Sequence, residues 1–315
     1  MPDVQRVCVA VATFRRQRQL AGLLHKLPLQ VIDPTKHTLR FLIIDNDVTP
    51  TAKAVVDAAR QQFSDPLQYI HVPDPGLSVV RNFALRNASE NDAFLAMLDD
   101  DEVPEPGWLA ELLHVQDVTN ADAVVGPVSP CLPEGAPRWL KRGRFYEEFM
   151  LRDRAALKDG TTANCLLKLS SISRMRLTFD PFFNELGGED QFFFRELSSR
   201  GGTIVFAANA VVRDIIPTER TSLRYLATRE FRKGNSLSLC DLRLTPTIQS
   251  KLTRLLKSVA LFSVSMLSLL PRTCILGGTG AAESVSGAAR ALGMLAGLGG
   301  YRLTAYPRQK SARTG

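Results

Sequence analysis

The stretch Phe94-Leu-Ala-Met-Leu-Asp-Asp-Asp-Glu-Val-Pro-Glu-Pro-Gly-Trp-Leu109 contains an apolar run that ends abruptly in acidic residues. A short apolar run bounded by turn-forming residues is typical of a buried strand. The acids that follow it are Asp99, Asp100, Asp101 and Glu102. Residues two apart in an extended or tightly turned backbone face the same way, as Asp99 and Asp101 would. The stretch therefore predicts two carboxylates side by side at the end of a sheet strand.

This pair of carboxylates is a candidate metal site. Like charges this close repel each other unless a cation lies between them. Hard oxygen ligands in small number suit Mg²⁺ or Mn²⁺, with a substrate phosphate completing the coordination shell. The alternative is a solvated acidic turn that leads into the next helix, since Pro104, Pro106 and Trp108 look like a helix start. The acids alone leave both interpretations open.

Three apolar, β-branched segments precede this strand, at residues 6–12, 40–44 and 68–72, and helical patterns lie between them. Strands alternating with helices predict an open, mostly parallel α/β sheet with right-handed crossovers. Ligands bind at the carboxyl ends of the strands in such sheets. Thr13, Asp45 and Asp47 fall at those ends together with the acid cluster. The first strand-to-helix turn carries neither a glycine-rich dinucleotide fingerprint nor a phosphate-binding loop.

A second candidate centre is Gly187-Gly-Glu-Asp190, which opens an apolar helix. Glycines allow a tight backbone approach. Acids in a first helical turn are commonly only partners of the helix dipole. The functional interpretation is a general base that faces the metal site. An arginine-rich helix over residues 220–234 is either merely solvated or placed to neutralise a diphosphate.

The composition indicates a globular chain of 315 residues, with 45% hydrophobic and 23% charged residues. Its five cysteines are scattered without a Cys-x-x-Cys pair, which favours reduced thiols in a cytosolic setting over disulfides or zinc. A strand follows almost at once, so we expect no signal peptide. The net charge of +7 belongs to the tail, because residues 251–315 hold nine basic residues against one acid. A nucleic-acid enzyme would carry basic clusters around its site, so we expect no nucleic-acid partner.

The basic tail, residues 241–315, is predicted to be a helical segment that associates with a membrane. Lys251, Arg254 and Lys257 recur every three residues and so share roughly one helical face. The uncharged run at 258–270 is only 13 residues, whereas a spanning helix needs about 20. We therefore expect a peripheral anchor on the cytoplasmic face of the inner membrane, with its basic residues against anionic headgroups. The alternative is a pair of ordinary helices packed on the catalytic domain.

Taken together, these residues resemble the family 2 glycosyltransferases, the inverting enzymes of the GT-A fold, over about residues 5–240. The matching pieces are Val-Ala-Thr-Phe-Arg-Arg (11–16), Ile-Ile-Asp-Asn-Asp (43–47), Gly-Leu-Ser-Val-Val-Arg-Asn (76–82), Leu-Asp-Asp-Asp-Glu (98–102) and Gly-Gly-Glu-Asp (187–190). The chain is similar to bacterial exopolysaccharide glycosyltransferases of the succinoglycan-biosynthesis kind. The resemblance implies a GT-A catalytic domain at residues 1–240, with a mostly parallel central sheet flanked by helices and a C-terminal helical tail.

The resemblance also implies roles. Asp190 would be the catalytic base, and Asp101 with Asp99 would bind Mn²⁺ or Mg²⁺. The residues expected to contact the nucleotide or substrate are Thr13, Asp45, Asp47, Arg81, Asp99, Asp100, Glu189 and Arg232. The donor would be a nucleotide-sugar, with uridine the usual nucleotide, and the acceptor a glycan or lipid-linked saccharide. The second-strand motif departs from the family pattern, and the three consecutive acids leave the assignment among residues 99–101 open by one position.

Two other functions compete with this one. A metal-dependent nucleotidyltransferase that makes sugar nucleotides usually carries a glycine-rich basic loop after the first strand. Here Arg15, Arg16 and Arg18 supply the charge without the glycines. An inactive GT-A domain that serves as a membrane scaffold is the second alternative, and the presence of Asp101 and Asp190 argues against it.

Overall fold

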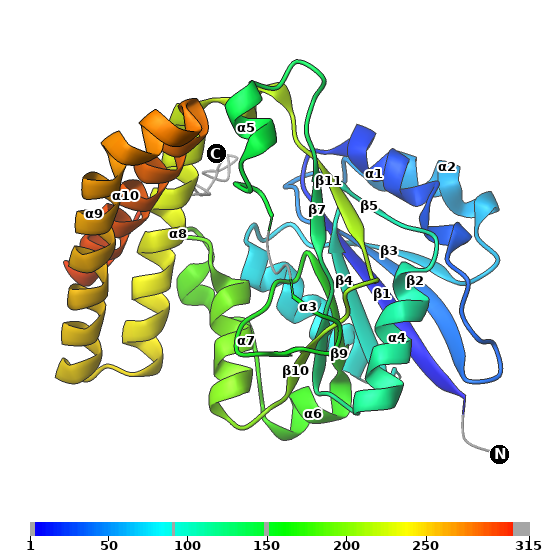
Figure 1. Cartoon of the computed structure of the whole chain (residues 1–315). Coiled ribbons are helices and arrows are strands. Elements are labelled where there is room, and N and C mark those ends of the chain that lie inside the picture. Colours follow the sequence, from blue (N-terminus) through cyan, green and yellow to red (C-terminus); the bar gives the residue numbers. More distant parts are fainter. Residues whose placement is uncertain (1–3, 90–91, 148–150, 305–315) are drawn as a thin grey trace, which may run out of the picture.

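The computed structural model describes residues 4–89, 92–147 and 151–304 (Figure 1). An eight-stranded sheet lies at its centre, in the order β3-β2-β1-β4-β9-β6-β10-β8. Its strands are β1 (Gln5–Thr13), β2 (His37–Asp45), β3 (Leu67–His71), β4 (Phe94–Asp99), β6 (Ala123–Val125), β8 (Ala156–Leu157), β9 (Asn164–Lys168) and β10 (Ile204–Phe206). Within this sheet, four of the seven described strand pairings are parallel. The mostly parallel sheet is thus confirmed.

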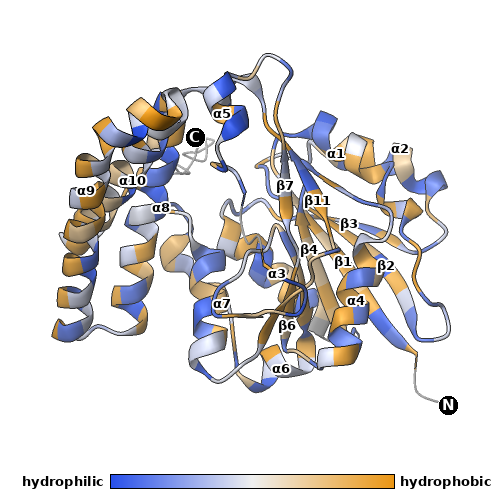
Figure 2. Cartoon of the chain, viewed as in Figure 1, coloured by the Kyte–Doolittle hydropathy of each residue, from blue (hydrophilic) through white to orange (hydrophobic). Residues whose placement is uncertain are grey.

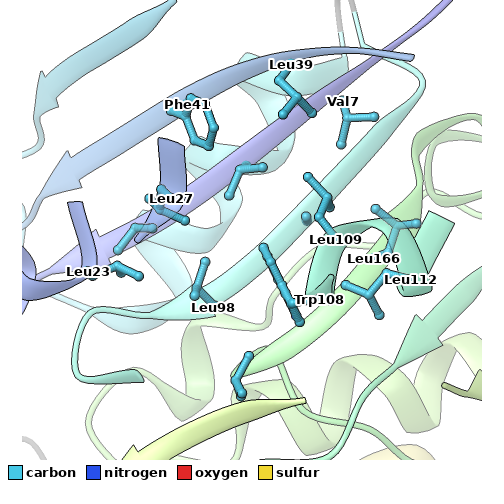
Figure 3. Close-up of a cluster of buried hydrophobic side chains, with 14 of the residues drawn as sticks. Val7, Leu23, Leu27, Leu39, Phe41, Leu98, Trp108, Leu109, Leu112 and Leu166 are labelled. Carbon is cyan, nitrogen blue, oxygen red and sulfur yellow. The ribbon is translucent and has the colours of Figure 1, made fainter. Parts of the chain in front are cut away.

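Helices cover both faces of this sheet, which is why β1 and β4 are continuous apolar runs. One face packs against α1 (Gln17–Leu24), α2 (Lys53–Ala59) and α4 (Trp108–Thr119). The other packs against α3 (Leu77–Ser89), α6 (Leu169–Arg174) and α7 (Glu189–Ser199). Figure 3 shows the first core, where Trp108 and Leu109 at the start of α4 pack near Leu98 of β4.

The antiparallel pairings are the part of the sheet that the sequence did not predict. Strand β9 runs antiparallel between β4 and β6. A second, three-stranded sheet has the order β5-β11-β7, formed by β5 (Glu102–Pro104), β11 (Val212–Ile215) and β7 (Val128–Cys131). Because β5 begins at Glu102, Asp100 and Asp101 occupy a tight turn between two strands rather than a loop that leads directly to a helix.

Three long helices follow the sheet domain: α8 (Leu223–Leu244), α9 (Ile248–Leu276) and α10 (Gly278–Leu298). They lie together beside the sheet (Figure 1), and α10 packs along both α8 and α9. The short helix α5 (Arg138–Arg142) meets α10, where Thr279 Oγ1 donates to the carbonyl of Trp139 at 3.1 Å. Short 3₁₀ turns occupy Leu27–Leu29, Arg60–Gln62, Pro181–Phe183 and Thr218–Thr221. The predicted domain boundary at residue 240 stays a prediction, and it falls inside α8.

Helix α9 has the reverse of the burial pattern expected in a soluble protein, because its buried residues are polar and its large apolar residues are mostly exposed. Its buried residues are polar, namely Arg254, Ser258 and Ser265. Its exposed residues include a long apolar set: Ile248, Leu252, Leu255, Leu256, Val259, Val264, Met266, Leu267, Leu270, Ile275 and Leu276. Figure 2 shows the hydrophobic colouring along this outer helix. At 29 residues α9 is also long and apolar enough to cross a membrane by length and composition alone, so its length does not decide between a crossing and a peripheral anchor, and the peripheral anchor stays a prediction.

Candidate active site

Three neighbouring parallel strands end at one edge of the sheet. Thr13 of β1 is in register with Asp45 of β2, and Ala12 of β1 is in register with Asp99 of β4. The polar groups expected at the strand ends therefore share one edge. This is the place where open α/β sheets bind ligands.

Asp100 is the buried member of the acid cluster, with 3% of the residue exposed. Its carboxylate accepts hydrogen bonds from Thr13 Oγ1 at 2.7 Å and from Arg16 Nη1 at 2.9 Å. The same Arg16 nitrogen lies 2.9 Å from Asp101 Oδ2. Arg16 thus supplies positive charge between two acids, a role that sequence reasoning missed. Thr13 and Asp100 stay predicted substrate ligands, although in this structure they bind each other.

Asp99 and Glu189 are joined by the guanidinium of Arg81. Arg81 Nη2 lies 3.7 Å from Asp99 Oδ1, and Arg81 Nη1 pairs with Glu189 Oε1. Arg81 is itself buried, so it lies behind the acids rather than at the open edge. Crowding by protein atoms, together with Asp101, Asp100 and Asp190, raises the pKa of Asp99 to about 6, although Arg81 opposes the shift.

Glu189 and Asp190 face different surroundings although they are adjacent. Glu189 is 3% exposed, and its Oε2 has no hydrogen-bond partner among the described residues. Burial raises the pKa of Glu189 to about 7, against the opposing charge of Arg81. Asp190 is partly exposed. Of the two acids, only Asp190 is open to an incoming hydroxyl.

The position of Asp190 is set by the start of α7. Gly187 and Gly188 have φ of 75° and 91°, a conformation that favours glycine, and α7 begins at Glu189. Asp190 Oδ1 accepts from the backbone N–H of Gln191 at 2.7 Å, and Oδ2 accepts from Thr161 Oγ1 at 3.2 Å. The positive end of the helix dipole favours the charged carboxylate here. Sequence reasoning missed Thr161, because its proximity to Asp190 comes only from the fold.

Asp45 and Asp47 are held inside the chain. Asp45 is fully buried and accepts from Ala52 N at 2.8 Å, from Tyr69 Oη at 2.9 Å and from Asp47 N at 3.2 Å. Asp47 accepts from Arg15 Nε at 3.0 Å and from Val48 N at 2.8 Å. Burial alone would raise the pKa of Asp47, but these bonds hold it below its ordinary value. Their roles as nucleotide ligands stay predictions, and a nucleotide would have to replace one of these donors.

A further acid, Asp214, was not predicted to belong to the site. It lies on β11, opposite Glu102 of β5. Burial raises the pKa of Asp214, with Asp101 adding to the shift and Arg220 and Arg229 opposing it. Glu102 is buried, accepts from Asp99 N at 3.0 Å, and has a pKa well above its ordinary value through burial and the charge of Asp99. The acid cluster thus extends onto the second sheet.

Arg232 is the predicted site residue that the structure leaves apart from the acids. It is half-buried on α8, and among the described residues it forms no ion pair with an acid of the site. Its neighbour Arg229 lies with its guanidinium carbon 4.8 Å from the ring centroid of Tyr146. A role of Arg232 beside the leaving group stays a prediction.

The acids fit a divalent cation only if the substrate completes its shell. Asp99 and Asp101 are hard carboxylate ligands, of the kind Mg²⁺ and Mn²⁺ prefer. Within the described part of the chain, no group of three or more His, Cys, Asp or Glu side chains is placed to hold a metal. Two carboxylates with diphosphate oxygens and water make up the usual shell of a nucleotide-bound Mg²⁺.

Known proteins are similar to this chain in sequence and in fold. The model of glycosyl transferase family 2 matches residues 8–176. Succinoglycan biosynthesis protein ExoM of Rhizobium meliloti is 36% identical over 234 residues, which is 74% of this chain and 74% of that protein.

Among solved structures, the mannosyltransferase PcManGT from Pyrobaculum calidifontis in complex with GDP-Man and Mn²⁺ matches with a TM-score of 0.64 and 14% identity. The match covers 94% of this chain and 88% of PcManGT. TarS 1-349 of S. aureus in complex with UDP-GlcNAc matches with a TM-score of 0.53 and 14% identity, over 94% of this chain and 92% of that chain. At this identity the two structures bear on the fold alone, and they confirm the expected GT-A architecture.

Proposed function

Because the chain belongs to glycosyl transferase family 2, we propose that it moves a sugar from a UDP-sugar to a hydroxyl of a glycan or lipid-linked saccharide, with inversion at the anomeric carbon. The relative ExoM is named for succinoglycan biosynthesis, which supports a place in bacterial surface polysaccharide biosynthesis. A nucleotide-sugar donor is consistent with the GDP-Man and UDP-GlcNAc bound to the structurally similar proteins.

One observation carries this proposal: a partly exposed acid lies at the same sheet edge as the acidic turn. Arg81 contacts both Asp99 of the turn and Glu189, the residue before Asp190. The charge of Asp190 also acts on Asp99. A donor diphosphate at the turn and an acceptor hydroxyl at Asp190 would therefore meet at one place.

The proposed reaction uses these groups in order. Asp190 accepts the proton of the acceptor hydroxyl, whose oxygen attacks the anomeric carbon. The nucleoside diphosphate leaves from the opposite face, so the configuration inverts. Asp99 and Asp101 would hold a divalent cation, which when bound offsets the negative charge that grows on the leaving diphosphate. Arg81 orients Asp99, and the dipole of α7 favours the charged form of Asp190.

The family membership bears differently on the two competing functions. Membership of a glycosyl transferase family leaves the nucleotidyltransferase without support. The inactive scaffold predicts no turnover of any donor, and a donor screen decides between it and an enzyme.

We expect the full-length protein to release UDP from at least one UDP-sugar in the presence of Mn²⁺. The screen offers a panel of UDP-, GDP- and dTDP-sugars, with and without a bacterial membrane lipid extract as acceptor source, and measures the nucleoside diphosphate. GDP or dTDP release in place of UDP would correct the nucleotide. If no donor were consumed under either condition, the chain would be a scaffold.

We further propose that the protein is peripheral on the cytoplasmic face of the inner membrane, with α9 against the lipid. Two features support this. Most of the exposed large side chains of α9 are apolar, from Ile248 to Leu276, although Lys251, Lys257 and Arg272 are exposed as well. Its inner face packs on small residues of α10, where Gly287 lies so close to Ser265 that a side chain would collide. Small residues between helices and apolar residues outside are typical of helix packing in lipid.

The mode of attachment differs from the expected one. Arg254 was predicted to share an exposed basic face with Lys251 and Lys257, but it is buried and pairs with Asp241 of α8. Arg272 and Arg290 are also paired, with Glu283 and Glu230. Apolar contact is therefore the main force we propose, with Lys251 and Lys257 as minor contributors toward anionic headgroups.

We expect full-length protein to bind vesicles of phosphatidylcholine alone nearly as well as vesicles that contain phosphatidylglycerol. Replacing both Leu267 and Leu270 by Gln should weaken this binding by at least about tenfold, because each buried leucine contributes roughly 1.5–3 kcal/mol. Both side chains are more than three-quarters exposed, so folding should be unaffected. Vesicle co-sedimentation measures the effect.

The matched control replaces the exposed Leu29 and Val31, in and just after the 3₁₀ turn that follows α1, by Gln. These changes should leave vesicle binding intact. A wild-type protein that ignored both kinds of vesicle, and instead self-associated in sedimentation equilibrium, would assign the apolar face of α9 to a second copy of the chain.

A further inference from the structure

A series of alternating acids and arginines, here called the ionic chain, connects α9 to Thr161, the residue that holds Asp190. We infer that Asp159, Arg195 and Asp241 of this ionic chain are positioning residues for the base, and that Arg254 extends it to α9. The inference rests on the proposed role of Asp190 as the proton acceptor.

At the active site, the ionic chain ends in the segment that precedes β9. Thr161 Oγ1 donates to Asp190 Oδ2 at 3.2 Å, and the same hydroxyl accepts from Ala163 N at 3.2 Å. Two residues earlier, Asp159 accepts from Gly160 N at 2.9 Å. Thr161 can hold Asp190 only while this short segment keeps its place.

Arg195 fixes that segment from α7. Arg195 Nε lies 2.8 Å from Asp159 Oδ2, and Arg195 Nη1 lies 2.5 Å from Asp241 Oδ1 on α8. The other oxygen of Asp241 pairs with Arg254 of α9. Four alternating charges thus run from the segment before β9, through α7 and α8, to the helix that carries the apolar outer face.

The four side chains of the ionic chain are sufficiently shielded from solvent for their charges to interact strongly. The side chains of Arg195, Asp159 and Asp241 are 24%, 25% and 21% exposed, and that of Arg254 is 10% exposed. Burial raises the pKa of Asp159, with Arg195 opposing and the charge of Asp190 adding to the shift. Burial and the charge of Arg195 lower the pKa of Arg254. Without Asp241, the two guanidiniums would face each other uncompensated.

Helix α8 does not depend on these charges for its attachment to α7. An apolar cluster already joins the two helices, formed by Phe183, Leu186, Phe192, Leu239 and Cys240. Ser236 Oγ also donates to the carbonyl of Gly187 at 3.2 Å. Loss of the ionic chain should therefore displace the base by a fraction of an ångström rather than unfold the protein. Misplacement of a reacting group by about 1 Å can cost about 10²-fold in rate.

The test compares Asp241→Asn with the wild-type full-length protein. We expect kcat for donor hydrolysis, in which water replaces the acceptor hydroxyl, to fall by about tenfold. The KM for the donor should stay within about twofold, because none of these four charged residues pairs with the acidic turn in the part of the protein that the structure describes. Asp241→Glu keeps the charge and should recover much of the rate.

A double-mutant cycle shows whether the effect passes through Thr161. Thr161→Val alone should lower kcat, and adding Asp241→Asn should lower it little further, because both changes release the same group. Glu283→Gln is the matched control, since it breaks the exposed Arg272 ion pair between α9 and α10 and should leave kcat unchanged.

Four outcomes decide the inference. A normal kcat for Asp241→Asn at an unchanged melting temperature would overturn it, as would multiplicative effects of Thr161→Val and Asp241→Asn. If Asp190→Asn itself kept full activity, the proposed base would be wrong instead, independently of Asp241. A drop in melting temperature with normal kcat would assign the ionic chain a purely structural role.

Discussion

Asp190→Asn should lower the turnover of the donor by about 10²–10⁴-fold, the usual effect of losing a general base. The amide keeps the shape of the carboxylate: its oxygen can accept from Gln191 N, and its NH₂ group can donate to Thr161 Oγ1, at the places where the two oxygens of Asp190 accept. It cannot take a proton from the acceptor hydroxyl. Binding of the nucleoside diphosphate with Mn²⁺, measured by calorimetry, should therefore stay close to that of the wild type.

Glu189→Gln is the matched control for this experiment, because it makes the same chemical change one residue earlier. Glu189 is buried against Arg81, so its amide should weaken the hold on Arg81 and Asp99 without removing a proton acceptor. We expect a smaller loss of rate and a lower melting temperature. Normal turnover by Asp190→Asn combined with inactivity of Glu189→Gln would show that the wrong acid had been chosen.

The parallel half of the sheet could be predicted from the sequence because its strands are long apolar runs. Residues 6–12 and 40–44 were predicted as strands, and the structure has β1 at Gln5–Thr13 and β2 at His37–Asp45. The strands that were missed are two to four residues long and carry no periodic signal. Strand β5 forms because it pairs with β11, more than a hundred residues away in the chain, and local sequence does not report such a pairing.

The acids of the site could be found from sequence, but their partners could not. An apolar run that ends in Asp99, Asp100 and Asp101 is enough to identify a polar strand end. That Arg16 lies between Asp100 and Asp101, or that Thr161 donates to Asp190, depends on which segments the fold brings together. For the same reason, sequence could not reveal that the carboxylate of Asp45 already binds donors within its own chain.

The tail shows that the spacing of charged residues does not reveal which face of a helix is buried. A spacing of three places Lys251, Arg254 and Lys257 near one helical face, but it does not say which face is covered. In the structure Arg254 points inward to Asp241, whereas leucines occupy the outside. A buried arginine is normally paired with an acid, and here that acid is Asp241 of α8.

The second large effect is expected from the acidic turn. Asp101→Ala should remove most donor turnover, and excess EDTA should do the same to the wild type, because a cation at this turn would lose a carboxylate ligand or be absent altogether. Since the pKa of Asp99 is raised to about 6, Mn²⁺ binding should also weaken as the pH falls through 6, where Asp99 takes up a proton. Calorimetric titration with Mn²⁺ and UDP measures both changes.

The folded state should survive Asp101→Ala, because the side chain is 21% exposed and its ion pair with Arg16 leaves Arg16 still bound to Asp100. Glu105→Ala is the matched control: it breaks an ion pair with Arg213, just beyond β5 and outside the turn. This control should bind Mn²⁺ and turn over donor normally. Full activity of the wild type in excess EDTA would instead mean that Arg16, rather than a metal, neutralises the leaving diphosphate, and Arg16→Gln should then cause the large loss expected here for Asp101→Ala.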